Sequence, residues 1–205
     1  MDKKDARNER GETYAEPSRP ARVGHDRGRA MIVVALGANL STDAHGPPEA
    51  GLHAALDIMP GYGVSVVRRS RLYRSAPVPP SGQPWYVNAV AIVATALGPR
   101  ELLAALLAIE ARFGRVRRER NDARVLDLDL IDYDGRVGHW PASGELPALD
   151  LPHPRLATRG FVLLPLAELE PGWRHPESGA SPATLIAALP PGQTTQALEE
   201  MPREA

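Results

Sequence analysis

The stretch RVLDLDLIDYDG, residues 124–135, limits the possible folds most strongly, because leucines and aspartates alternate along it. In a β-strand, residues i and i+2 point to the same face of the sheet. The leucines of LDLDL therefore share one face. Asp127 and Asp129 share the other, with Cα atoms about 7 Å apart. Such a strand fits a sheet that packs one face on a hydrophobic core and offers the other to a ligand.

The segments around this strand predict an α+β fold. Apolar β-branched runs predict strands, and apolar residues spaced three or four apart predict helices. The predicted order is that of a ferredoxin-like β-α-β-β-α-β sandwich, an antiparallel sheet with two helices on one face and its other face free. The expected strands are 31–40, 64–75, 85–97 and 125–135, and the expected helices are 47–63 and 98–114, followed by proline-rich loops and helices at 158–168 and 181–189.

Composition limits the classes of protein that remain. The net charge is −1 and the chain has no cysteine, so neither nucleic-acid binding by bulk charge nor a thiol site is indicated. Residues 1–30 mix both signs of charge with almost no apolar residue, and we expect them to form a disordered leader. Residues 31–205 are expected to form a single domain, with a core over about 31–176 and a C-terminal extension. No run is long enough for a membrane helix.

The two aspartates have a chemical interpretation and a structural one. Adjacent carboxylates repel each other, and a divalent cation such as Mg²⁺ relieves that conflict. The D-x-D pair alone is weak evidence, since a solvated face paired with arginines would carry it too. The arginine-rich segment ARFGRVRRERNDAR, residues 111–124, leads directly into the strand. Arginine binds phosphate bidentately, so the combination favours metal ions and arginines around a polyphosphate.

Two further stretches provide candidate binding residues. The segment 151–161, LPHPRLATRGF, places His153 near two arginines, where it could contact phosphate or be structural. The proline-rich segment 74–90 ends in a strand bearing Tyr86 and Asn88, which could wall a planar ligand or, for Tyr86, belong to the core. The chain has no Walker loop, Rossmann glycine motif or serine-hydrolase elbow.

Five motifs occur in order over about residues 31–176: ALGANL, LYRSAPVPPSGQPWYVNAV, IEARFGRVR, ARVLDLDLI and LPHPRLATRGFVLLPLAEL. Together they resemble the 6-hydroxymethyl-7,8-dihydropterin pyrophosphokinase family of folate biosynthesis. The resemblance implies a Mg²⁺-dependent transfer of pyrophosphate from ATP to the pterin hydroxymethyl group, with release of AMP. We expect a cytoplasmic monomer whose partners are ATP and the pterin, with two Mg²⁺ ions and without nucleic acid or membrane.

The resemblance also implies roles for individual residues. Asp127 and Asp129 would bind the metal ions, and Asn88 and Phe161 would hydrogen-bond and stack on the pterin ring. Catalysis would involve both aspartates with Arg115, Arg117 and Arg124. The implied ATP-binding residues are Glu110, Arg115, Arg117, Arg124, Leu130, His153 and Arg159, and the implied pterin-binding residues are Ser75, Ala76, Val78, Tyr86, Asn88 and Phe161.

The sequence differs from the family pattern in the arginine-rich segment. Asn121 stands near where well-known members carry a tryptophan. We therefore expect residues 115–124 to close over ATP mainly through arginine–phosphate contacts. The competing enzyme class is a metal-dependent nucleotidyltransferase, which would release pyrophosphate instead of AMP. A nucleotide- or RNA-binding module would need exposed aromatic residues and a basic chain, and aromatic residues make up only 5% of this one.

Overall fold

The computed structural model of the chain describes residues 31–114 and 123–199. The leader expected at residues 1–30 lies outside the described residues, as do Arg115 and Arg117 and most of the segment expected to close over ATP. Among the described residues, no helix is both long enough and apolar enough to cross a membrane.

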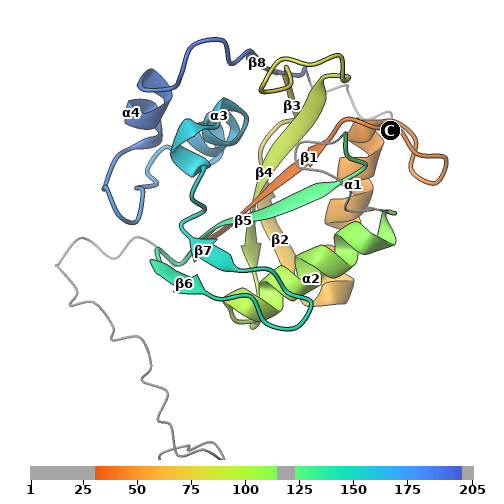
Figure 1. The fold of residues 1–205 in the computed structure, drawn as a ribbon, viewed down its shortest axis with the longest axis horizontal. Coiled ribbons are helices and arrows are strands. Elements are labelled where there is room, and N and C mark those ends of the chain that lie inside the picture. The colour runs from red at the N-terminus through yellow and green to blue at the C-terminus, as the bar shows by residue number, and fades with distance from the viewer. Residues whose placement is uncertain (1–30, 115–122, 200–205) are drawn as a thin grey trace, which may run out of the picture.

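A six-stranded antiparallel sheet forms the centre of the molecule (Figure 1). Its strands run in the order β5-β1-β4-β3-β8, and β2 also pairs with β4. If β2 and β3 together are counted as the second strand, this is the antiparallel β-α-β-β-α-β sandwich predicted from the sequence. The strands are β1 (Ile32–Ala38), β2 (Ser65–Arg69), β3 (Tyr73–Ser75), β4 (Tyr86–Ala94), β5 (Asp127–Tyr133) and β8 (Thr195–Ala197).

Helices α1 (Pro48–Ile58) and α2 (Pro99–Arg112) cover one face of the sheet. Leu52 of α1 and Leu106 of α2 are fully buried there, and Leu128 and Leu130 of β5 belong to the same core. At about 25 cal/mol per Å² of buried apolar surface, this layer supplies most of the drive to fold. The leucines of LDLDL therefore face the helices, as their alternation predicted.

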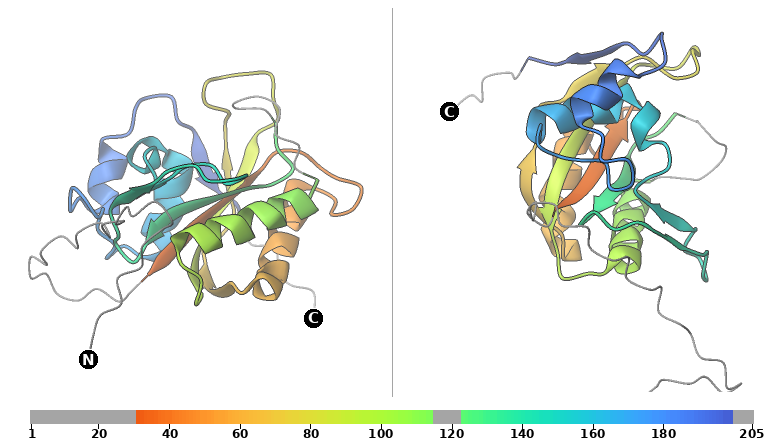
Figure 2. Two further views of the ribbon diagram at one scale, coloured as in Figure 1. Left: turned by 60° about the horizontal axis from the view of Figure 1, so that its bottom comes forward. Right: turned by 90° about the vertical axis from the view of Figure 1, so that its left-hand side faces the viewer.

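The opposite face is only partly free, so the prediction of an uncovered face was wrong. Helices α3 (Gly160–Leu169) and α4 (Pro182–Ala187) lie on that side (Figure 2). Leu163 and Leu166 of α3 form a second core with Val33 and Ile131. The sheet is therefore sandwiched over part of its area, and a ligand could reach only the remainder.

The strand predicted over 64–75 is two strands, which corrects that assignment. Ser70 separates them: its main-chain N–H donates to Val90 O at 2.9 Å, and its hydroxyl accepts from Val90 N at 3.0 Å. The Ser70 hydroxyl thus accepts the hydrogen bond from Val90 N that a main-chain oxygen would accept in a regular ladder. The chain then turns before β3 begins. Two short strands outside the central sheet, β6 (Gly138–Trp140) and β7 (Leu149–Leu151), pair with each other where only loops were expected.

Candidate active site

The uncovered part of the sheet face has a floor of small residues. Ala35 of β1 pairs with Asp129, and Gly37 pairs with Asp127 on one side and Asn88 on the other. Paired residues of an antiparallel ladder point to the same face. A Cβ on residue 37 would lie 3.2 Å from Asn88 Oδ1, so glycine lets the amide lie low across the strand. β1 therefore forms a shallow floor between the aspartates of β5 and the polar residues of β4.

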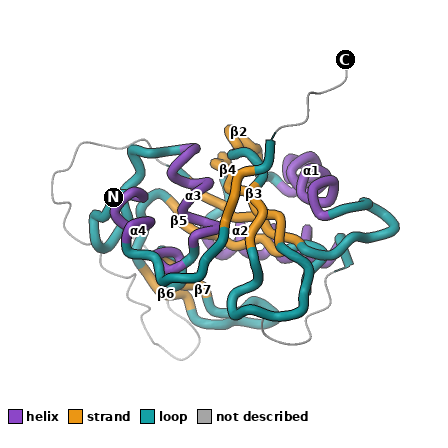
Figure 3. The backbone as a smooth tube through the Cα atoms, turned by 90° about the horizontal axis from the view of Figure 1, so that it is seen from above, coloured by secondary structure: helices purple, strands orange, loops and turns teal. Residues whose placement is uncertain are grey.

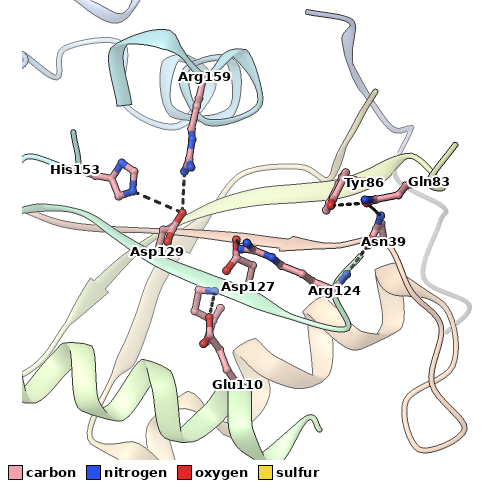
Figure 4. A network of polar contacts seen from close by, with 10 residues as sticks. Asn39, Gln83, Tyr86, Glu110, Arg124, Asp127, Asp129, His153 and Arg159 are labelled. Atoms are coloured by element: carbon pink, nitrogen blue, oxygen red, sulfur yellow. Dashed lines mark hydrogen bonds and ion pairs between the residues drawn. The ribbon is translucent and has the colours of Figure 1, made fainter. Parts of the chain in front are cut away.

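Each aspartate is paired with an arginine from a different part of the chain (Figure 4). Arg124, just before β5, bonds Asp127 through Nη1, and both side chains are about three-quarters buried. Arg159, at the start of α3, places Nη1 2.9 Å from Asp129 Oδ2. Burial tends to lower the pKa of Arg124, but the Asp127 carboxylate outweighs it and the pKa is raised. The two arginines therefore supply positive charge beside the carboxylate pair.

His153 completes this cluster from the loop before α3. Its main-chain N–H donates to Ile131 O, which attaches the loop to β5. Its Nδ1 accepts from Arg155 N at 3.1 Å, so in the neutral ring the proton is on Nε2, 3.9 Å from Asp129 Oδ2. Burial lowers the pKa of His153, and the attraction of Asp129 offsets only part of this effect. A neutral imidazole therefore points an N–H toward the carboxylates.

Arg159 has unused hydrogen-bonding capacity. Its Nε is buried and has no hydrogen-bond partner among residues 31–114 and 123–199. Its guanidinium carbon lies 5.5 Å from the centre of the Phe161 ring. An anion that entered beside Asp129 could therefore accept hydrogen bonds from this side chain.

Two of the predicted ATP-binding residues lie on the helix side of β5. Glu110 is 2% exposed, and its Oε1 accepts from Leu128 N at 2.7 Å. Leu130 packs in the core beneath α1 and α2, so its main chain is the part available to the cavity. Because β5 is an edge strand, both residues lie where the cavity passes over that edge toward α2. Glu110 also fixes the strand that carries the aspartates.

The predicted pterin-binding residues lie across the floor from the aspartates. Asn88 and Ser75 are both 3% exposed, and Asn88 Nδ2 donates to Ser75 Oγ at 2.9 Å. Tyr86 pairs with Ser75 and donates its hydroxyl proton to Gln83 Oε1 at 3.0 Å. Ala76 and Val78 follow in the proline-rich loop, and Phe161 reaches the same cavity from α3.

One cavity of about 830 Å³ joins these groups. That volume lies within the usual range of small-molecule sites, roughly 300–1,000 Å³. Residues of the loop before β4, of the start of α3 and of β7 line the cavity. Figure 3 shows the backbone of these elements from above. All the predicted site residues among those the structure describes line the cavity: Ser75, Ala76, Val78, Tyr86, Asn88, Glu110, Arg124, Asp127, Asp129, Leu130, His153, Arg159 and Phe161.

Asn39 is a site residue that the sequence interpretation missed. It is 3% exposed, and its Oδ1 accepts from Arg124 N at 2.7 Å. Its Nδ2 donates to Gln83 Oε1 at 3.3 Å and to Pro84 O at 3.2 Å. The ALGANL motif, in which Asn39 lies, was the only available signal. Asn39 therefore ties the proline-rich loop to the residue that pairs with Asp127.

We expect Asn39→Ala to weaken use of both substrates. The change removes the acceptor for Arg124 N–H and the donor to Pro84 O, and each such hydrogen bond contributes about 0.5–1.5 kcal/mol. Steady-state kinetics with each substrate varied should show higher KM values for both, and urea unfolding should show lower stability. Ser41→Ala, at an exposed position two residues after Asn39 and outside the cavity lining, is the control. A rise in only one KM would contradict the linking role.

The comparisons with known proteins identify the family of the chain. Residues 33–171 match the family model 7,8-dihydro-6-hydroxymethylpterin-pyrophosphokinase. A Synechocystis protein described as 2-amino-4-hydroxy-6-hydroxymethyldihydropteridine pyrophosphokinase is 42% identical over 155 residues, 75% of this chain and 73% of the relative. A Pseudomonas aeruginosa protein of the same description is 41% identical over 160 residues, 78% of this chain and 91% of the relative.

The fold also matches solved structures. A crystal structure of Plasmodium falciparum HPPK-DHPS aligns with a TM-score of 0.59 and 12% identity, over 78% of this chain and 43% of that one. An identity this low supports the fold alone. Together, the fold, the site and the comparisons define an α+β enzyme that acts as a kinase. The chain belongs to the 7,8-dihydro-6-hydroxymethylpterin-pyrophosphokinase family, and its activity is pyrophosphoryl transfer to hydroxymethyldihydropterin in folate synthesis.

Proposed function

We propose that the reaction uses ATP and Mg²⁺, with Asp127 and Asp129 as the protein's metal ligands. The observation that carries this proposal is the pair of carboxylates on the uncovered sheet face, each held by an arginine, in one cavity with the predicted pterin residues. Among the described residues, no third acidic or histidine side chain completes a metal site. That fits Mg²⁺, which is commonly held by one or two carboxylates plus substrate phosphates and water.

The bonds that change define the reaction. The pterin hydroxymethyl oxygen attacks the β-phosphorus of ATP, the bond from that phosphorus to the α,β-bridging oxygen breaks, and the hydroxyl proton is released. AMP leaves, and the pterin carries the pyrophosphate. Bound Mg²⁺ would neutralise charge on the phosphates. Arg124, Arg159 and His153 would orient them by hydrogen bonds, since phosphoryl transfer depends mainly on positioning and charge.

The pterin would lie over Gly37, against Asn88 and Phe161. Asn88 Nδ2 is held by Ser75, so its Oδ1 is oriented to accept from a ring N–H. The low floor at Gly37 leaves room for a flat ring. This arrangement would bring the hydroxymethyl group toward the aspartates.

Asn88→Ala and Tyr86→Ala should reduce pterin affinity by about tenfold or more, while ATP affinity changes by less than about twofold. Both residues lie across β1 from the carboxylates, and a buried polar group left without its partner costs about 1–3 kcal/mol. Calorimetry with each ligand separately checks this. Tyr86→Phe keeps the ring and is the milder control. Equal losses of ATP and pterin affinity would mean that Asn88 and Tyr86 have a structural role and do not bind the pterin.

The products from ATP test the proposed reaction. Incubation with ATP, Mg²⁺ and 6-hydroxymethyl-7,8-dihydropterin should yield AMP in step with the pterin pyrophosphate. Release of pyrophosphate would instead indicate a nucleotidyltransferase, and ADP would indicate a simple kinase. Omitting Mg²⁺ should abolish the reaction, and persistent turnover in chelator would contradict the assigned metal ligands.

The expected monomeric state and cytoplasmic location belong to the same proposal. Light scattering of the purified protein tests the first point, and fractionation of cells that express it tests the second.

A further inference from the structure

The first turn of α3 carries Arg159 but lacks a cap of its own. Arg159 is the N-cap residue, with φ −114° and ψ 102°, and its side chain makes no capping bond. N-cap positions favour Ser, Thr, Asp or Asn, whose oxygens accept from the first free N–H groups of a helix. An arginine that reaches to Asp129 cannot serve that purpose. The main chain around it therefore needs support from elsewhere.

Gln193 supplies that support from 33 residues away. Its Oε1 accepts from Gly160 N at 2.7 Å, and its Nε2 donates to Thr158 O at 2.8 Å. The two bonds hold the main chain immediately before and after Arg159. A Cβ on residue 160 would lie 3.2 Å from Gln193 Oε1, so glycine allows the close approach.

The segment that carries Gln193 is itself attached to the opposite wall of the cavity. Thr194 O accepts from Ala76 N at 3.1 Å, and Thr195 pairs with Ser75 where β8 joins β3. Gly192 and Gln193 line the cavity. This segment lies beyond the residues that match the family model, which end at 171. It therefore spans from the pterin side of the cavity to the start of α3.

We propose that Gln193 is a positioning residue that fixes the main chain on both sides of Arg159 and so holds the guanidinium against Asp129. The inference rests on the proposed function only where Arg159 is taken to bind ATP phosphates. We call the two hydrogen bonds from Gln193 to Gly160 N and Thr158 O the clamp. Whether the clamp exists can be measured without turnover.

Gln193→Met tests the clamp, because it keeps the side-chain length and removes both hydrogen bonds. We expect about tenfold lower kcat/KM for ATP, the size of one lost hydrogen bond. Amide hydrogen exchange at Gly160 should become faster. Gln193→Glu keeps an acceptor for Gly160 but loses the donor to Thr158, so its loss should be intermediate. Gln196→Met, an exposed glutamine in β8, is the matched control and should behave like the wild type.

A double-mutant cycle separates positioning from general destabilisation. If Gln193 acts through Arg159, Gln193→Met should lower kcat/KM for ATP by less than about twofold in an Arg159→Ala background. The effects of substitutions at coupled residues are not additive. Fully multiplicative losses would overturn the proposal. So would unchanged Gly160 exchange in Gln193→Met. A wild-type protein without diphosphokinase activity would refute the proposed function, while Gly160 exchange would still decide whether the clamp exists.

Discussion

Replacing Asp127 or Asp129 by alanine is expected to reduce turnover by orders of magnitude while the fold stays intact. Both carboxylates lie on the uncovered face, and no other acidic cluster among the described residues could replace them. Removing a metal ligand at a phosphoryl-transfer site costs several kcal/mol of transition-state stabilisation. Some loss of stability is also expected, because these ion pairs are mostly buried and each substitution leaves a partly buried guanidinium without its carboxylate.

The measurement is kcat over a range of Mg²⁺ concentrations, with thermal unfolding of each variant. Asp57→Ala is the control, since Asp57 is an exposed aspartate on α1, on the far side of the sheet. Wild-type turnover by either variant at limiting Mg²⁺ would refute the metal assignment. A collapsed melting temperature would show that the carboxylates are structural.

The alternation of LDLDL predicted the two faces of β5 correctly, but only as far as a bulge. On β1, Val34 pairs with Leu130 and the neighbouring Val33 pairs with Asp132. Ile131 between them has no partner and forms a β-bulge. Ile131 and Asp132 therefore both point toward α3, where Asp132 accepts from Trp173 Nε1 at 2.8 Å. A strict two-residue period cannot reveal this. The third aspartate of the strand is consequently a buried structural group and not a ligand of the cavity.

The composition of α3 indicates that the second face of the sheet is covered. The helix GFVLLPLAEL is apolar around most of its circumference, and such helices are usually buried. The long-range hydrogen bonds at the site have no corresponding pattern in the sequence. Asn39 meets Pro84 across 45 residues, and Gln193 meets Gly160 across 33. Contacts of this kind depend on the completed fold, and no local pattern predicts them.

Mg²⁺ and ATP are expected to bind with strong positive coupling. Arg124 and Arg159 form ion pairs with Asp127 and Asp129. Mg²⁺ alone must displace arginines whose carboxylate partners, among residues 31–114 and 123–199, are these two aspartates. The triphosphate supplies that anion, so each arginine can move from carboxylate to phosphate as the metal ions take the aspartates. We expect a non-hydrolysable ATP analogue to tighten Mg²⁺ binding by about 5- to 150-fold, the usual range of coupling between sites.

Arg124→Gln tests whether the arginine moves from carboxylate to phosphate, because it should change Mg²⁺ affinity and turnover in opposite directions. Without the guanidinium, the metal has one competitor fewer for Asp127, so calorimetry should show tighter Mg²⁺ binding in the absence of nucleotide. Turnover should fall, because the phosphates lose a donor. Arg136→Gln removes the same charge from an exposed turn and should change neither. If Arg124→Gln bound Mg²⁺ no better than the wild type without nucleotide, the arginine would not compete with the metal, and the coupling would need another origin.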